Sequence, residues 1–173
     1  MTLNLLDQLE SEASENDLIL RVQVRKPLNI WTLRLVVAEK IDNYGVKILG
    51  EMKAWAYSGL SGLQLDTMAV IPSAPPALGD LIWSATMAWA LECTPCRNCR
   101  LLAICDDEFK HKILVRYFEQ RGFVKTRNVG SSLYDLPLRT IWGGAGSLMK
   151  ADCENVGEIS YRRWRKLLSK TSK

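Results

Sequence analysis

Residues 101–123 constrain the fold more than any other segment, because they read as a strand, a helix and a second strand joined by very short connections. The apolar run 101–105 is followed by Asp106 and Asp107, an acidic pair that suits a helix N-terminus, where backbone N–H groups attract negative charge. Gly122 ends the helix and Phe123 opens the next strand. The apolar residues that recur on one face of this helix are Phe109, Ile113 and Tyr117.

The first half of the chain has the alternating pattern of antiparallel strands. Residues 18–71 contain several runs in which apolar and polar residues alternate, and the last of them is 63–71. The connections are too short for crossover helices, so we expect a meander. A proline-rich loop at 72–79 leads to a helix near 80–92, and the strand at 101–105 and a helix near 108–121 follow. This order predicts an α+β domain with a mixed, mostly antiparallel sheet flanked by helices.

Composition narrows the class of protein. With 173 residues the chain fits one domain, and its 47% hydrophobic and 24% charged residues exclude a disordered protein. No apolar run approaches the roughly 20 residues of a transmembrane helix, and the N-terminus lacks the basic start of a secretory signal. Five cysteines, an odd number, fit a reducing compartment. We therefore expect a cytoplasmic protein that does not span a membrane.

The net charge of +4 is concentrated at the C-terminus. Residues 158–173 carry six basic side chains against one acid, so the preceding chain is nearly neutral. We divide the sequence into a lead-in at 1–16, a domain at 17–150 and a basic tail at 151–173. Within the tail, residues 158–173 have too few apolar side chains to complete a core, and we expect them to bind an anionic partner: a protein, a nucleic acid or a membrane surface. The alternative is a terminal helix folded back on the domain.

The helix and strand at 101–123 carry an aromatic-x-x-x-Gly-Phe signature, Phe118 to Phe123. This signature resembles the second half of the GNAT-type acyl-CoA N-acyltransferases, and the resemblance covers about residues 18–149. It implies the GNAT fold, in which the strands at 63 and 101 run parallel and splay apart to form a cofactor cleft. It also implies acetyl-CoA as co-substrate, an amine as acceptor and no metal. The sequence of residues 101–149 is similar to that of GNAT-like proteins of cyanobacteria and plastids. For a plant protein this resemblance implies a location in the plastid stroma.

The resemblance also implies a pyrophosphate-binding loop, with the family pattern Arg/Gln-x-x-Gly-x-Gly/Ala, at residues 74–79. Ala74 replaces the basic or amide residue, Pro75 and Pro76 have no N–H to donate, and Asp80 adds a negative charge near the phosphates. We therefore expect weakened binding of CoA. The cofactor-binding residues implied by the match are Met68, Ala77, Leu78, Gly79 and Asp80.

Two residues are candidates for proton transfer. Asp66, in the strand before the loop, ranks ahead of Glu51 as the carboxylate that deprotonates the amine in this fold. The alternative is a carboxylate that merely faces outward from its strand, with a water as the base. N–H groups near residues 65–68 would polarise the thioester carbonyl. His111 is the only histidine and the second candidate, although a solvated position between two lysines is the alternative. The family's tyrosine, four residues before the glycine, is here Phe118, which has no proton to give. Tyr117 is adjacent but about 100° away around the helix.

A cysteine cluster offers a different chemistry. Cys93, Cys96 and Cys99 have C-x2-C-x2-C spacing, and Cys105 is a possible fourth thiolate for a metal or an iron–sulfur cluster. The Cys-Pro that follows such sets in ferredoxins is missing, and we expect no metal. Two functions remain: an N-acyltransferase that moves an acetyl group to an amine, or a catalytically impaired GNAT-fold protein that serves as a binding or assembly factor through its basic tail.

Overall fold

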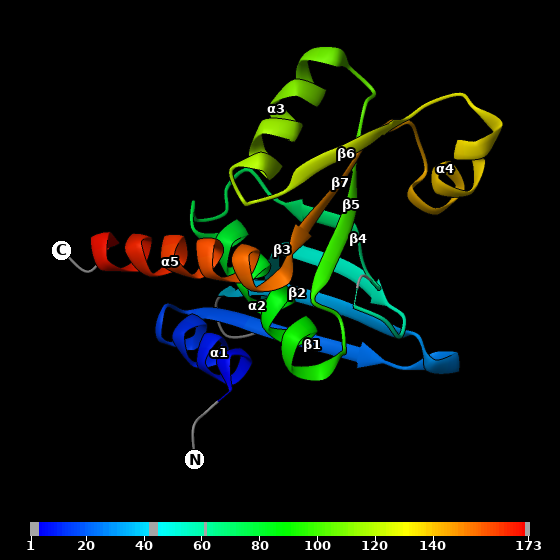
Figure 1. Cartoon of the computed structure of the whole chain (residues 1–173). Coiled ribbons are helices and arrows are strands. Elements are labelled where there is room, and N and C mark those ends of the chain that lie inside the picture. Colours follow the sequence, from blue (N-terminus) through cyan, green and yellow to red (C-terminus); the bar gives the residue numbers. More distant parts are fainter. Residues whose placement is uncertain (1–3, 42–44, 61, 172–173) are drawn as a thin grey trace.

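The computed structural model describes residues 4–41, 45–60 and 62–171. Its strands form a seven-stranded sheet with the order β1-β2-β3-β4-β5-β7-β6 (Figure 1). The strands are β1 Leu18–Arg25, β2 Trp31–Ile41, β3 Gly45–Ala56, β4 Leu63–Val70, β5 Asn98–Ile104, β6 Val124–Val129 and β7 Gly146–Asp152. The helices are α1 Leu5–Glu15, α2 Leu78–Cys93, α3 Glu108–Glu119, α4 Leu136–Trp142 and α5 Cys153–Thr171, with short 3-10 turns at Pro27–Asn29 and Leu133–Asp135.

Strands β1 to β4 form the antiparallel meander that the alternating pattern predicts. Leu33 and Leu35 of β2 are buried, and Arg34 between them is exposed, so one face of the sheet is apolar and the other polar. β5, β7 and β6 continue the sheet with antiparallel pairs. The predicted fold class, an α+β domain with a mixed and mostly antiparallel sheet, is confirmed.

The predicted parallel strand pair is also confirmed. β4 and β5 pair in parallel at only two positions, Leu63 with Cys99 and Gln64 with Arg100. Beyond these two pairs the strands share no further register, although β4 runs on to Val70 and β5 to Ile104. The sheet therefore opens between β4 and β5, as the sequence led us to expect.

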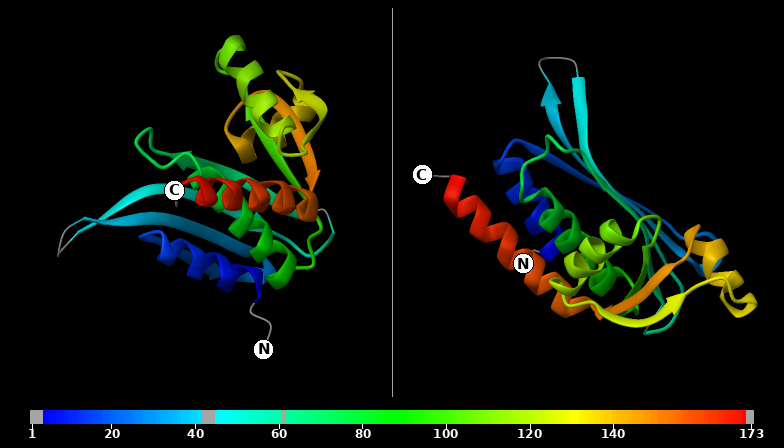
Figure 2. Two further views of the ribbon diagram at one scale, coloured as in Figure 1. Left: turned by 90° about the vertical axis from the view of Figure 1, so that its left-hand side faces the viewer. Right: turned by 90° about the horizontal axis from the view of Figure 1, so that it is seen from above.

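Helices cover the apolar face of the meander. α2 is buried on nearly all sides and packs between the sheet, α1 and α5 (Figures 1 and 2). Gly50 of β3 permits this close approach, because a Cβ there would lie 2.8 Å from the terminal methyl of Ile82. On the opposite face α4 contributes Trp142 to a smaller apolar cluster with Leu102 and Leu148. Among the described residues, every helix is too short or too polar to span a lipid bilayer.

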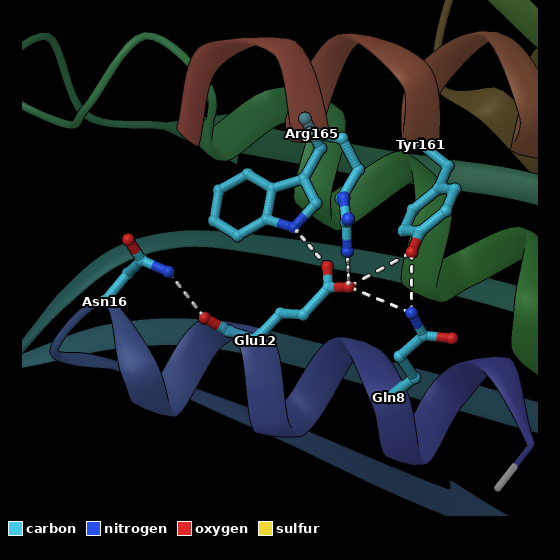
Figure 3. Close-up of polar contacts among 6 residues, drawn as sticks. Gln8, Glu12, Asn16, Tyr161 and Arg165 are labelled. Carbon is cyan, nitrogen blue, oxygen red and sulfur yellow. Dashed lines mark hydrogen bonds and ion pairs between the residues drawn. The ribbon is translucent and has the colours of Figure 1, made fainter. Parts of the chain in front are cut away.

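The first and last helices are joined by a buried carboxylate, Glu12 (Figure 3). Its oxygens accept hydrogen bonds from Arg165 Nη1 at 2.7 Å, Trp164 Nε1 at 3.0 Å, and the hydroxyl of Tyr161 and Nε2 of Gln8, both at 3.0 Å. Burial raises the pKa of the Glu12 carboxyl, but the hydrogen bonds from these four side chains outweigh it, so the pKa lies below its usual value. The charged form of Glu12 is therefore part of the folded structure.

The expectation that residues 158–173 have too few apolar side chains to complete a core is wrong. Trp164 is 1% exposed and belongs to the main core, and Leu167 and Leu168 pack against it. The alternative, a terminal helix folded back on the domain, describes α5. Arg163 of α5 donates a hydrogen bond to the backbone carbonyl of Gln120, whereas the side chain of Lys166 is exposed. Contact with an anionic partner stays a prediction, and the Lys170 side chain and Lys173 lie outside the described residues.

Candidate functional site

The opening between β4 and β5 contains a small cavity of about 50 Å³, which we call the splay cavity. Next to it the register of β3 and β4 shifts, because Lys53 pairs with Thr67 while Ala54 pairs with Leu65. Asp66 is the extra residue of a β-bulge, a feature that re-aims a side chain and interrupts the ladder of hydrogen bonds. The cavity is lined by Met52, Leu65, Asp66, Thr67, Met68, Trp83, Leu101, Leu102 and Phe118.

A longer apolar groove runs from this cavity along α3. Its volume is about 490 Å³, and it shares Met68 and Phe118 with the splay cavity, so the two spaces adjoin. Few polar groups face it, which suits a flexible, largely apolar chain. The apolar groove is lined by Met68, Val70, Lys110, Ile113, Leu114, Tyr117 and Phe118.

The N-terminus of α2 lies beside the groove. A Cβ on Gly79 would be 3.5 Å from Met68 Cε and 3.7 Å from the Tyr117 hydroxyl, which places the start of the helix next to both side chains. The N–H groups of Leu78 and Asp80 already donate to the carbonyls of Pro75 and Ala77. Within the described part of the chain, the N–H groups of Ala77 and Gly79 make no hydrogen bond, so these two amides are available to an anion.

Asp80 does not carry the free negative charge that the sequence led us to expect at this loop. Its carboxylate accepts a hydrogen bond from Arg121 Nη2 at 2.8 Å, and both side chains are less than 10% exposed. Burial raises the pKa of the Asp80 carboxyl, and the charges of Arg121 and Arg163 offset only part of this effect. The ion pair joins α2 to the residues after α3 and neutralises the charge of Asp80 near the free amides of Ala77 and Gly79.

Tyr117 and Phe118 both line the apolar groove, although as adjacent residues they lie about 100° apart around α3. The indole N–H of Trp83 donates to the Tyr117 hydroxyl at 3.1 Å, and the guanidinium of Arg121 lies 3.9 Å from the centre of the Tyr117 ring. Phe118 packs edge-on against Trp83. Because the Tyr117 oxygen accepts the hydrogen bond from the indole N–H of Trp83, the O–H of Tyr117 can donate into the groove.

His111 lies elsewhere. Its Nδ1 is 3.2 Å from the carbonyl oxygen of Ile104, so Nδ1 carries a proton and donates it, and its Nε2 is 3.1 Å from Ser147 Oγ. The ring borders a separate hollow of about 560 Å³ with Asn128 and Lys125, and Asp66 is not part of that hollow. The structure therefore does not bring His111 and Asp66 together. It also holds His111 by two hydrogen bonds instead of leaving it solvated on the helix.

The polar face of the meander carries a second space that reaches Asp66. This open-face pocket has a volume of about 430 Å³ and extends from β1 to β4. Glu51, the other candidate base, forms ion pairs with Arg34 at 3.3 Å and Lys53 at 3.6 Å. Asp66 is exposed, and within the described residues no cation pairs with its carboxylate.

The cysteines do not converge. Cys93 and Cys105 are exposed, whereas Cys96 and Cys99 are buried. The neighbouring thiol of Cys153 and burial raise the pKa of Cys99 well above its usual range, which disfavours a thiolate there. In residues 4–41, 45–60 and 62–171, no three His, Cys, Asp or Glu side chains gather as metal ligands do.

No protein-family model and no curated protein match the sequence. Solved structures do match. A chimeric spermidine N-acetyltransferase from Vibrio cholerae is 11% identical with a TM-score of 0.51, and the match covers 87% of this chain and 79% of the other. Nourseothricin acetyltransferase is 12% identical with a TM-score of 0.50, over 83% and 93%. An acetyltransferase of the GNAT family from Streptococcus pneumoniae is 16% identical with a TM-score of 0.46, over 70% and 66%. The chain has the fold of GNAT acetyltransferases, at a low level of sequence identity.

Proposed function

We propose that the protein is an N-acyltransferase that moves an acetyl group from acetyl-CoA to an amine. One observation carries this proposal: Asp66 lines the splay cavity on one side and the open-face pocket on the other. A thioester held in the groove and an amine held on the open face would meet at its carboxylate. No other residue lines both spaces in the described part of the chain.

The residues present fit acetyl-CoA in outline. The apolar groove suits the pantetheine arm, and the free amides of Ala77 and Gly79 at the N-terminus of α2 suit a phosphate. Met68 adjoins both the groove and the splay cavity. Pro75 and Pro76 supply no donors, so fewer hydrogen bonds reach the phosphates than a loop without prolines would give.

The reaction needs two proton transfers. The amine nitrogen attacks the carbonyl carbon of the thioester, and the C–N bond forms as the C–S bond breaks. Asp66 takes the proton that the nitrogen loses, directly or through water, and the Tyr117 hydroxyl gives a proton to the departing thiolate. Backbone N–H groups at the bulge stabilise the charge that develops on the carbonyl oxygen. The products are an N-acetylated amine and CoA.

Phe118, Pro75 and Pro76 favour a second candidate, a GNAT-fold protein that has lost its chemistry and serves as a binding or assembly factor. In that case the groove is a feature of the fold without a catalytic role, and the protein acts by binding a partner through its surface. The two candidates differ in a measurable way, because only the first releases CoA when an amine is added.

The test is an assay of free thiol and acetylated product with acetyl-CoA and a panel of amines. Asp66→Asn should lower the rate by about 100-fold or more, the range expected for loss of a general base. Asp106→Asn removes an exposed carboxylate that lines none of these spaces and serves as the matched control. Equal rates for both variants, or no acetylated product with any amine, would contradict the proposal.

A further inference from the structure

The open-face pocket carries more positive charge than acyl transfer alone requires. Three cations line it, and the only carboxylate among its lining residues is Asp66. Its volume of about 430 Å³ is within the range of small-molecule sites. The lining residues are Gln23, Arg25, Thr32, Leu33, Arg34, Lys53, Ala54, Trp55 and Asp66.

The cations are not balanced within the protein. Arg34 and Lys53 lie directly opposite each other on β2 and β3, an arrangement of like charges that is destabilising. Glu51 pairs with both, so one carboxylate serves two cations. The guanidinium of Arg25 makes no ion pair or hydrogen bond within the described residues. The pocket therefore holds a surplus of positive charge that a bound anion would relieve.

The charges are ordered across the sheet. Asp66 lies on β4, Lys53 on β3, Arg34 on β2 and Arg25 on β1. Neighbouring strands are about 4.8 Å apart, so the backbones of these cations lie roughly 5, 10 and 14 Å from that of β4. A ligand lying across the strands meets a carboxylate at one end and cations toward the other. Arg side chains present the planar donors that carboxylates and phosphates accept.

We propose that the acceptor is a small amine that also carries an anionic group, a carboxylate or a phosphate. The amine lies at Asp66, and the anionic group lies over Arg34 and Arg25, with Trp55 beside it. This inference rests on the proposed function for the fate of the amine, but the binding of the anionic amine does not depend on catalysis. A dication meets repulsion in the same pocket.

The kinetic test uses pairs of acceptors that differ only in the anionic group. Glycylglycine is compared with glycylglycinamide for a carboxylate, phosphoethanolamine with ethanolamine for a phosphate, and 1,4-diaminobutane represents a dication. We expect the anionic member of at least one pair to have a kcat/KM at least about tenfold higher, the effect of one charge-assisted hydrogen bond. Which pair responds distinguishes the carboxylate from the phosphate. The double variant Arg25→Gln with Arg34→Gln should abolish the preference, and Arg21→Gln, a cation of β1 outside this pocket, should keep it.

A binding measurement separates this inference from the proposed function. The same amines are titrated without acetyl-CoA, and the ¹⁵N–¹H signal of the Trp55 indole reports occupancy of the pocket. A shift with anionic amines that is lost in the double variant supports the inference even if no acetyl transfer occurs. Transfer that prefers neutral amines or the dication, or a preference that persists in the double variant, overturns the inference while the acyltransferase stands. No shift and no transfer overturn both.

Discussion

The indole N–H of Trp164 donates a hydrogen bond of 3.0 Å to a carboxylate oxygen of Glu12, a residue 152 positions earlier in the chain (Figure 3). The contact joins α5 to α1, and both helices pack on α2. Leu9 and Ala13 of α1 are fully buried in the same core. Helices α1 and α5 therefore stabilise each other and α2, the helix that follows the proline-rich loop at 72–79.

Removing the Trp164 side chain should destabilise the protein. Trp164→Ala is expected to cost about 3 to 5 kcal/mol, because it leaves a cavity in a packed core and removes one of the four side-chain donors to the Glu12 carboxylate. Urea unfolding followed by circular dichroism measures the change. Tyr134→Ala, at a tyrosine that is 91% exposed, should cost under about 0.5 kcal/mol. A small effect at Trp164 would show that α5 is separable from the domain.

The charge of Glu12 makes the stability of the folded protein depend on pH. Its pKa is lowered by folding, so its contribution is present above the pKa of the unfolded chain, about 4.3, and is lost as the pH falls through the native pKa. Glu12→Gln should therefore lower stability at pH 7 and flatten the fall below about pH 5. Thermal unfolding at pH 3 to 7 measures both. Glu15→Gln, at an exposed position on α1, should behave as the unchanged protein. If the stability of both variants falls with the same slope below about pH 5, this account is contradicted.

The hydroxyl of Tyr117 should affect chemistry more than binding. Tyr117→Phe keeps the ring under Arg121 and removes the hydroxyl, which is both the proton donor that we assign to the leaving thiolate and the acceptor of the Trp83 indole N–H. We expect kcat to fall by about 100-fold or more while KM for acetyl-CoA changes little. Tyr134→Phe is the matched control. A variant with unchanged kcat would show that water protonates the thiolate.

The prolines of the loop should limit the affinity for CoA. Pro75→Ala with Pro76→Ala restores two N–H donors, and each new hydrogen bond to a charged phosphate contributes about 1.5 to 3 kcal/mol, so binding should tighten roughly tenfold or more. Pro95→Ala, outside the loop, tests for a general effect of losing a proline. Equal affinities would mean that these N–H groups do not reach the phosphates.

Local patterns were enough to predict the meander strands, β5, β6 and helices α2 and α3 from the sequence, but not helix α4 or strand β7. Alternation identified the strands of the meander, and the signature ending at Gly122 and Phe123 located the strand and helix after the opening. The splay of β4 and β5 followed from the resemblance. These features depend on residues that are close in sequence, where periodicity and turn residues are informative.

The contacts between distant residues were not predictable in this way. Asp80 pairs with Arg121, 41 positions later, and Glu12 binds a helix that begins at Cys153. Charge alone gave Asp80 a different role and gave Glu12 none. The contacts of Tyr117 with the Trp83 indole and the Arg121 guanidinium depend on how α3 packs, which residue spacing does not reveal. The bulge at Asp66 is a shift in register between two strands, and only the pairing shows it.

The most direct test of the central claim is calorimetric titration of acetyl-CoA into the purified protein. If the groove, the α2 amides and the splay cavity form a binding site for the donor, the titration should give one site with a dissociation constant in the micromolar range, about −8 kcal/mol. Met68→Glu, which places a charge where the groove meets the splay cavity, should weaken it. The absence of heat at millimolar acetyl-CoA would contradict the acyltransferase and favour the binding factor.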